Sequence, residues 1–307
     1  MATEYLKKAP RTPTTGEEDT RQVVSEMLSE IREGGEERAR EYGVELDGYS
    51  GEIVIDRATI EAAARQIPER LKDDLRFARQ KVADFARRQR ESLREFETEL
   101  SPGVWAGQRL IPIETAGCYV PGGRYAHVAS AIMGITTAKA AGVENVIACS
   151  APHEGGGIHP AILYAMDLSG ADRILALGGV QGIGALAFGL FTGKKADILV
   201  GPGNRFVAEA KRMLFGSVGI DLFAGPTEIL IIADQTADPG VVAQDLVGQA
   251  EHGPDSPAWL VTTSRRLGEE VMARMEGLIA DLPREQSRAA EAAWRDYGEV
   301  TVCDTHE

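Results

Sequence analysis

The sequence predicts an α/β fold in which parallel sheets follow a helical N-terminal region. Residues 17 to about 100 are highly charged and carry apolar side chains at helical spacing. From about residue 116, short β-branched runs alternate with helix-length stretches and glycine-rich turns. Strands separated by helix-length segments are typical of a parallel sheet, because parallel neighbours need long crossover connections.

The N-terminal region is expected to form two long helices. The first begins near residue 17, and Gly34 and Gly35 are expected to end it. After the apolar run at 53–55, the second begins at Pro68, which suits a first-turn position, and Pro102-Gly103 closes it. Arginines between positions 87 and 94 alternate with acids, so we interpret this face as solvated and held by i,i+4 ion pairs.

Six apolar runs are expected to form the strands that follow. They are ENVIACSAP (144–152), ADRILALGG (171–179), KADILVGPGN (195–204), TEILIIAD (227–234), PAWLVTTS (257–264) and EVTVC (299–303). Ligands of open parallel sheets bind at the carboxyl ends of the strands. The glycine-rich loops near these runs are therefore where a ligand is expected.

Composition limits the classes of function. The 307 residues include 33 Lys and Arg against 47 Asp and Glu, a formal net charge of −14, which disfavours a nucleic-acid partner. The three cysteines, Cys118, Cys149 and Cys303, lack the spacing of a disulfide framework or zinc ribbon, so a cytoplasmic location is expected. Neither an N-terminal signal peptide nor an apolar stretch of membrane-spanning length is present, so no membrane partner is expected.

Two glycine-rich loops precede residue 190. The loop at 117–123 combines Tyr119 with a Gly122-Gly123 turn that allows a ligand to approach the backbone, although a plain strand-ending turn explains it better from sequence alone. The loop at 177–187 contains a Gly-x-Gly-x-x-Ala string. A dinucleotide fingerprint requires an acidic residue about 20 positions later, at the end of the next strand, and none stands there. We therefore place no standard pyrophosphate turn on this loop.

Two further loops follow, at 201–204 and 224–228. Asn204 is placed to cap the helix that follows it, although a helix N-terminus also suits phosphate. Thr227 places a hydroxyl group at a turn before the next strand. Taken singly, each of these loops is a turn.

The strongest local signal is the pair Gln249 and His252. Asp238-Pro239 opens a helix and Gly253-Pro254 stops it, so the two side chains are expected to share one face of its last turn. An amide oxygen and an imidazole so placed could both bind one Zn²⁺. Spacing alone favours the alternative, in which His252 interacts with the helix dipole and Gln249 faces water.

The other histidines and Cys118 are less informative. His127 lies close enough to the Gly122-Gly123 turn to help bind an anionic substrate, and a half-buried imidazole at a helix start is an equal alternative. His153 and His159 flank a glycine-rich loop and are expected to face solvent. Cys118 is expected to be a small buried apolar residue, because no neighbouring His or Lys would lower its pKa.

In this order, the four loops and the Gln/His turn resemble the histidinol dehydrogenase family. The matching segments are AGCYVPGG (116–123), GGVQGIGALAFG (178–189), GPGNRFVAEAKR (201–212), AGPTEILIIAD (224–234) and GQAEHGPDS (248–256). They cover most of residues 105–265. The segments MATEYLKK, GCYVPGGRYAHVASA and GSVGIDLFAGPTE resemble the sulfopropanediol dehydrogenase branch more than the enzymes of histidine biosynthesis.

The resemblance implies a zinc- and NAD-dependent homodimer. Such an enzyme oxidises a small polar primary alcohol through the aldehyde to the carboxylate, using two NAD⁺ in succession. The residues implied to contact NAD are Tyr119, Gln181 and Asn204. The candidate substrate residues are His127 and Thr227, together with the implied zinc ligands Gln249 and His252. The implied zinc role reverses the preference that spacing alone gave for these two side chains.

The sequence departs from the family pattern after Cys303. The family continues through a Glu-His acid/base pair, an aspartate zinc ligand and a last histidine ligand, and none of them is matched here. His306-Glu307 has the wrong order for the pair, so no catalytic residue is assigned. With two of four protein ligands, we expect weak zinc binding and negligible turnover. The family's final segment reaches across an intertwined homodimer, so its absence is expected to damage assembly.

The implied organisation is an arm at 1–16, a helical region at 17–118 joined with 226–307 as one discontinuous α/β domain, and a second Rossmann-like α/β domain at 119–225. The favoured substrate is 2,3-dihydroxypropane-1-sulfonate or a similar small polar alcohol, with L-histidinol as the alternative. A cation at Arg124 or His127 would suit a sulfonate. The alternative of another class is an inactive fragment that binds NAD.

Overall fold

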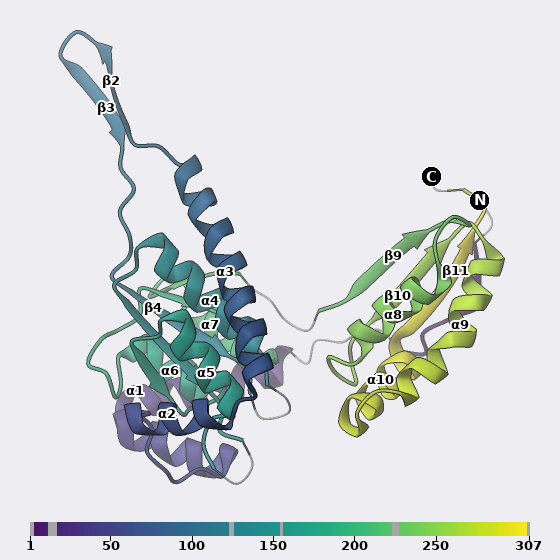
Figure 1. The fold of residues 1–307 in the computed structure, drawn as a ribbon, viewed down its shortest axis with the longest axis horizontal. Helices are drawn as coiled ribbons and strands as arrows, with labels where there is room; N and C mark the ends of the chain where they lie inside the picture. The colour runs from purple at the N-terminus through teal and green to yellow at the C-terminus, as the bar shows by residue number, and fades with distance from the viewer. Residues whose placement is uncertain (1–2, 12–16, 123–125, 154–155, 223–226, 306–307) are drawn as a thin grey trace. The chain divides into compact units, whose positions relative to one another are not determined.

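The computed structural model describes residues 3–11, 17–122, 126–153, 156–222 and 227–305. The chain divides into two units, one formed by residues 17–225 and the other by residues 1–16 and 226–307. Each unit has its own parallel strands with covering helices (Figure 1), which confirms the predicted α/β class.

The larger unit is built on a five-stranded parallel sheet. Across the sheet, the strands are β6 (Arg173–Leu175), β5 (Asn145–Ser150), β4 (Thr115–Val120), β7 (Ile198–Val200) and β8 (Gly219–Ile220). Every strand pair in it is parallel. The central strand β4 is buried along its whole length. This agrees with the sequence, since parallel sheets are covered on both faces and their strands are apolar.

Two apolar cores pack against this sheet. The helices of the larger unit are α1 (Glu17–Asp47), α2 (Arg57–Gln66), α3 (Glu69–Ser92), α4 (Val128–Ala141), α5 (Pro160–Ser169), α6 (Gly179–Phe188) and α7 (Arg205–Leu214). One core joins α1, α6 and α7, and the other joins α2, α3, α4 and α5. The predicted grouping of 17–118 with 226–307 differs from this division, because the first three helices pack on the helices that flank β4–β8.

Gly34 and Gly35 interrupt the first helix, as predicted. Gly35 takes a non-helical φ of 62° and makes a kink, so that α1 consists of two helical segments, of which the second runs to Asp47. Beyond the kink, Ala39 and Tyr42 are buried in the same core as Ile31. Burial of this second apolar stretch therefore stabilises a helical segment after the glycine break.

The second long helix is shorter than predicted. α3 ends at Ser92, and the chain then forms an antiparallel hairpin of β2 (Phe96–Ser101) and β3 (Val104–Gln108), with Pro102-Gly103 at its turn. In FETEL the apolar residues Phe96 and Leu100 are four apart, a spacing common to helices and strands, so the pattern alone does not exclude a helix. The arginine-rich end of α3 is paired as expected, but at i,i+3 spacing, as in Arg88–Glu91 at 2.8 Å.

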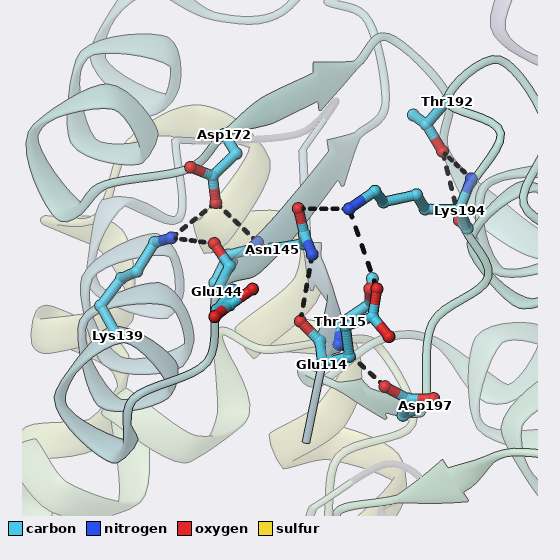
Figure 2. A network of polar contacts seen from close by, with 10 residues as sticks. Glu114, Thr115, Lys139, Glu144, Asn145, Asp172, Thr192, Lys194 and Asp197 are labelled. Carbon is cyan, nitrogen blue, oxygen red and sulfur yellow. Dashed lines mark hydrogen bonds and ion pairs between the residues drawn. The ribbon is translucent and has the colours of Figure 1, made fainter. Parts of the chain in front are cut away.

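Polar groups fix the amino ends of the central strands (Figure 2). Asp172 accepts hydrogen bonds from Lys139 Nζ at 2.6 Å and from the Val146 N–H at 2.7 Å. Asp197 accepts a bond from the Thr115 N–H at 2.8 Å, and Asn145 Oδ1 accepts one from Lys194 at 2.9 Å. This edge of the sheet is therefore held by structural contacts, and the carboxyl ends lie at the opposite edge.

The smaller unit contains a four-stranded sheet. Its order is β1 (Thr3–Lys7), β11 (Gly298–Cys303), β10 (Ala258–Thr262) and β9 (Ile229–Ala233). The last three strands are parallel to one another, whereas β1, from the predicted N-terminal arm, pairs antiparallel with β11. Three helices form its core with the sheet: α8 (Pro239–Ala250), α9 (Arg265–Ala280) and α10 (Arg284–Tyr297).

Among the described residues, no helix combines the length and the apolar character needed to cross a bilayer.

Candidate functional site

The larger unit brings Tyr119 and Gln181 together at the carboxyl edge of its sheet. Tyr119 lies near the end of β4, and Gln181 lies in the first turn of α6. The Tyr119 hydroxyl accepts a hydrogen bond from the Gly179 N–H at 3.2 Å. Both side chains are buried, with 6% and 1% of their surface exposed. Burial raises the pKa of Tyr119, so its hydroxyl keeps its proton and remains a donor.

The Gln181 amide is held at one end only. Its Nε2 donates to Asp47 Oδ2 at 2.9 Å, and the same carboxylate oxygen accepts a bond from the Gly178 N–H at 3.3 Å. The Gln181 oxygen is buried and has no hydrogen-bond partner within the residues that the structure describes. Buried polar atoms are normally paired, so this acceptor is suited to a bound polar ligand.

Asp47 was not identified from the sequence. It is the last residue of α1 and lies 131 positions from Gly178 and 134 from Gln181. Burial raises the pKa of its carboxyl group, and the two hydrogen bonds offset this effect only in part. No local motif marks it, because an acidic residue before a glycine is ordinary at the end of a helix.

Asn204 lies at the same edge of the sheet, in the loop after β7. Its Oδ1 accepts bonds from the N–H groups of Phe206 and Val207, at 3.0 and 3.1 Å, which confirms the predicted helix cap. β7 pairs with β4, so the carboxyl ends of the strands that carry Asn204 and Tyr119 are neighbours.

A buried ion pair fixes this loop. Gly201 donates its N–H to Asp221 at 2.8 Å, and its carbonyl oxygen accepts a bond from Lys211 Nζ at 2.9 Å. Lys211 is 3% exposed and also pairs with Asp221. Gly201 has a φ of 121°, and a Cβ there would lie 2.0 Å from the Tyr119 carbonyl oxygen. The sequence did not indicate Lys211 or Asp221, which meet only in the folded chain.

An open cavity of about 1570 Å³ adjoins this loop. Gly201, Pro202 and Asp221 line one part of it, and apolar side chains such as Ile113 and Met133 line another. Its volume is ample for a small-molecule ligand. The loop that carries Asn204 therefore has room for a ligand beside it.

In the smaller unit, Gln249 lies against Thr227. Gln249 Nε2 donates to the Thr227 carbonyl oxygen at 2.5 Å and to its hydroxyl at 3.1 Å. The alternative that Gln249 simply faces water is therefore wrong. Its amide oxygen, the atom that a metal ion would bind, is at the opposite end of the amide group.

His252 lies just outside the helix that was predicted to carry it. Asp238 caps α8 as expected, but the helix ends at Ala250, and His252 follows in an exposed turn. Its N–H still bonds to the Gln249 carbonyl oxygen at 3.2 Å. Among the described residues, no group of three or more His, Cys, Asp or Glu could hold a metal ion. Gln249 and His252 thus offer suitable donor atoms but only half of a four-ligand zinc set.

The remaining candidates have mixed outcomes. His127 is half-buried at the start of α4, as in the plainer interpretation, and Arg124 lies outside the described residues. Cys118 is buried, and this raises its pKa to about 12, as expected of an unreactive thiol. His153 is exposed, but the prediction that His159 faces solvent is wrong: it is half-buried and accepts a bond from the Ala161 N–H.

Known proteins resemble the chain over almost its whole length. A family model described as histidinol dehydrogenase matches residues 10–307. Two proteins of Ruegeria pomeroyi match all of this chain and 71% of their own length: a histidinol dehydrogenase homolog at 58% identity and sulfopropanediol 3-dehydrogenase at 54%. The crystal structure of histidinol dehydrogenase from Elizabethkingia anophelis superposes with a TM-score of 0.86 at 34% identity, over 97% of this chain and 68% of that one.

Proposed function

Because this chain belongs to the histidinol dehydrogenase family, we propose that it serves the NAD- and zinc-dependent oxidation of a small polar primary alcohol, through the aldehyde, to the carboxylate. The observation that carries the proposal is the buried oxygen of Gln181, which has no hydrogen-bond partner among the described residues, in the same helix turn as the Gly179 N–H that donates to the Tyr119 hydroxyl. An acceptor and a donor so placed at the carboxyl edge of a parallel sheet suit a polar cofactor.

Tyr119, Gln181 and Asn204 are the proposed NAD contacts. The Tyr119 hydroxyl remains a donor, the Gln181 oxygen is an acceptor, and the Asn204 amide nitrogen is not used by the helix cap. Bound NAD supplies the hydride acceptor for the alcohol carbon. The protein's part is to fix the cofactor in one orientation, and the burial of two of these side chains serves that purpose.

Gln249 and His252 are the proposed zinc ligands, with Thr227 at the substrate. Thr227 accepts hydrogen bonds from the Gln249 amide nitrogen. The Gln249 amide oxygen therefore faces away from Thr227, where it can bind a metal ion. Zinc would supply Lewis-acid polarisation of the substrate oxygen. Two donors do not complete such a site, so we propose that the others belong to a protein of the relatives' full length. The 307-residue chain by itself is then an NAD-binding unit with negligible turnover.

A substrate of the sulfopropanediol type is favoured over L-histidinol. The relative named sulfopropanediol 3-dehydrogenase is 54% identical to this chain, against 34% for the crystallised histidinol dehydrogenase. Among the described residues, His127 is the candidate for contact with the anionic group of the substrate.

A cytoplasmic location is also proposed. The three cysteines are not joined in disulfides, which supports it.

The test is NADH production by a protein extended to the length of these relatives. With zinc and 2,3-dihydroxypropane-1-sulfonate, two NADH per alcohol are expected, and little with L-histidinol. His252→Ala is expected to lower the rate by roughly 100-fold or more, because a metal ligand is lost. His153→Ala, which removes an exposed imidazole in the other unit, is the matched control. No NADH with either alcohol would contradict the substrate proposal, and an active His252→Ala variant would contradict the zinc site.

A homodimer is the proposed assembly, and the β2–β3 hairpin supports it. Figure 1 shows the hairpin extending from the sheet and helices of its own unit, and every residue of its two strands is exposed. Phe96 and Leu100, two strand positions on the same face, are 56% and 67% exposed. An isolated two-stranded hairpin is only marginally stable in water, so a second copy of the chain is the proposed cover for this face.

The double variant Phe96→Ser/Leu100→Ser is expected to be monomeric in light scattering, because it removes the apolar side chains of that face. A protein extended to the length of the relatives, with this face unchanged, is expected at twice the mass of its own chain. Glu97→Ser/Glu99→Ser alters the opposite face of the same strand and is expected to remain dimeric. If both double variants have the same mass, the proposal that the hairpin forms the dimer interface is contradicted.

A further inference from the structure

The carboxylate of Asp47 lies at the N-terminus of α6, although it comes from the end of α1. Its Oδ2 accepts bonds from the Gly178 N–H and the Gln181 Nε2, at 3.3 and 2.9 Å. It therefore joins two helices that are far apart in the sequence, at the point where the proposed NAD contacts gather.

Among the described residues, Asp47 is held by neutral donors. The groups that act on its pKa are the surrounding burial, Gln181 and the Gly178 N–H, with no cation among them. The titratable side chains that feel its charge are Tyr119 and Cys149, and burial raises the pKa of both, so both stay neutral. A half-buried carboxylate without a counter-ion among the described residues destabilises the fold at neutral pH, which indicates a role other than stability.

The same carboxylate determines which way the Gln181 amide faces. An ionised carboxylate only accepts hydrogen bonds, so the amide must turn its nitrogen toward Asp47 and its oxygen away. That oxygen is buried and unpaired among the described residues. A Cβ at Gly179 would lie 3.0 Å from it, so glycine, at a φ of 50°, avoids crowding this oxygen.

We propose that Asp47 is a positioning residue for the cofactor: it fixes the Gln181 amide with its oxygen toward bound NAD, where this oxygen accepts a hydrogen bond from an N–H or O–H of the cofactor. The inference rests on the proposed function, since it assumes that NAD binds beside Gln181. Asp47 itself need not touch the cofactor.

Asp47→Asn in the 307-residue chain is the first test, with NAD⁺ titrated calorimetrically. Asparagine fits the same space, but its own amide can pair with either end of Gln181, so the orientation is lost. The dissociation constant is expected to rise about tenfold, as for one hydrogen bond in a buried site. Glu37→Gln, an exposed acid on the same helix, removes the same charge and is expected to bind NAD⁺ as the wild type does. Asp47→Ser serves as a second variant, with the same expected loss.

Thermal unfolding separates positioning from a merely structural role. The folded state raises the pKa of Asp47, so its carboxyl contributes less stability as the pH rises through the ordinary aspartate range. At neutral pH, Asp47→Asn is therefore expected to unfold at the same temperature as the wild type or higher, while it binds NAD⁺ more weakly. Lower stability in both Asp47 variants would overturn the proposal.

A double-mutant cycle with Gln181→Ala completes the test. If Asp47 acts through the Gln181 amide, Asp47→Asn is expected to change NAD⁺ affinity less than twofold once that amide is absent. An equal tenfold loss in both backgrounds would overturn the positioning role. Unchanged affinity in Asp47→Asn would overturn this inference alone, whereas no NAD⁺ binding by the wild-type chain would overturn it together with the proposed cofactor site.

Discussion

Gly201→Ala is expected to lower the free energy of unfolding by about 3 kcal/mol or more, because it combines backbone strain with a steric clash. The residue has a φ of 121°, where side chains are strained, and the new Cβ would lie 2.0 Å from the Tyr119 carbonyl oxygen. The loop and β4 would have to separate to accommodate the methyl group. Urea unfolding followed by circular dichroism measures the loss.

Gly277→Ala is the matched control for this prediction. Gly277 lies within α9, and nothing lies within 4 Å of the position of its Cβ. Alanine is expected to stabilise the chain there by up to about 1 kcal/mol, because it favours the helix. The difference in the free energy of unfolding between the two variants tests the steric argument. A Gly201→Ala protein as stable as the wild type would show that the loop does not lie tight against β4.

Asp221→Ala is expected to lower the free energy of unfolding by about 3 kcal/mol. This value is near the lower end for breaking a buried ion pair, because part of Asp221 is exposed. The change leaves the Lys211 ammonium group, 3% exposed, with the Gly201 carbonyl oxygen at 2.9 Å as its acceptor among the described residues. It also removes the acceptor of the Gly201 N–H. Affinity for NAD⁺ is expected to fall as well, because the same loop carries Asn204.

Two further variants make this prediction specific. Glu209→Ala breaks the pair with Arg212 on the same helix, and a loss of at most about 1 kcal/mol is expected because the arginine is partly exposed. Adding Lys211→Met to Asp221→Ala removes the uncompensated charge and is expected to recover part of the stability. If the double variant is less stable than Asp221→Ala, the buried charge is not the source of the loss.

The order of the strands along the chain could be predicted well from the sequence. The six apolar runs contain β5, β6, β7, β9, β10 and β11, because β-branched residues between glycine-rich turns are a local signal. The helix cap at Asn204 and the start of α8 at Asp238-Pro239 could also be predicted from the local sequence, since a cap depends on neighbours two or three residues away.

Elements that depend on distant packing were predicted poorly. Gly35 breaks the first helix, as its local signal indicates, but a second helical segment follows because Ala39 and Tyr42 are buried on the far side of the kink. The hairpin after Ser92 resembles a helix in its sequence, because its charged residues are like those of the preceding segment. In both cases, burial or pairing with other segments adds structure that the local signal does not indicate.

By itself, the sequence determined the α/β class and the glycine-rich loops, since these depend on residue type and short spacing, and its resemblance to the histidinol dehydrogenase family implied the candidates Tyr119, Gln181, Asn204 and Gln249. Only the tertiary structure revealed the groups that hold them: Asp47 on the Gln181 amide, the Lys211–Asp221 pair on the Gly201 loop, and Thr227 on Gln249. The physical reason is that a buried amide or ammonium group must be satisfied by whichever chain segment packs against it. Packing between segments leaves no mark on local sequence.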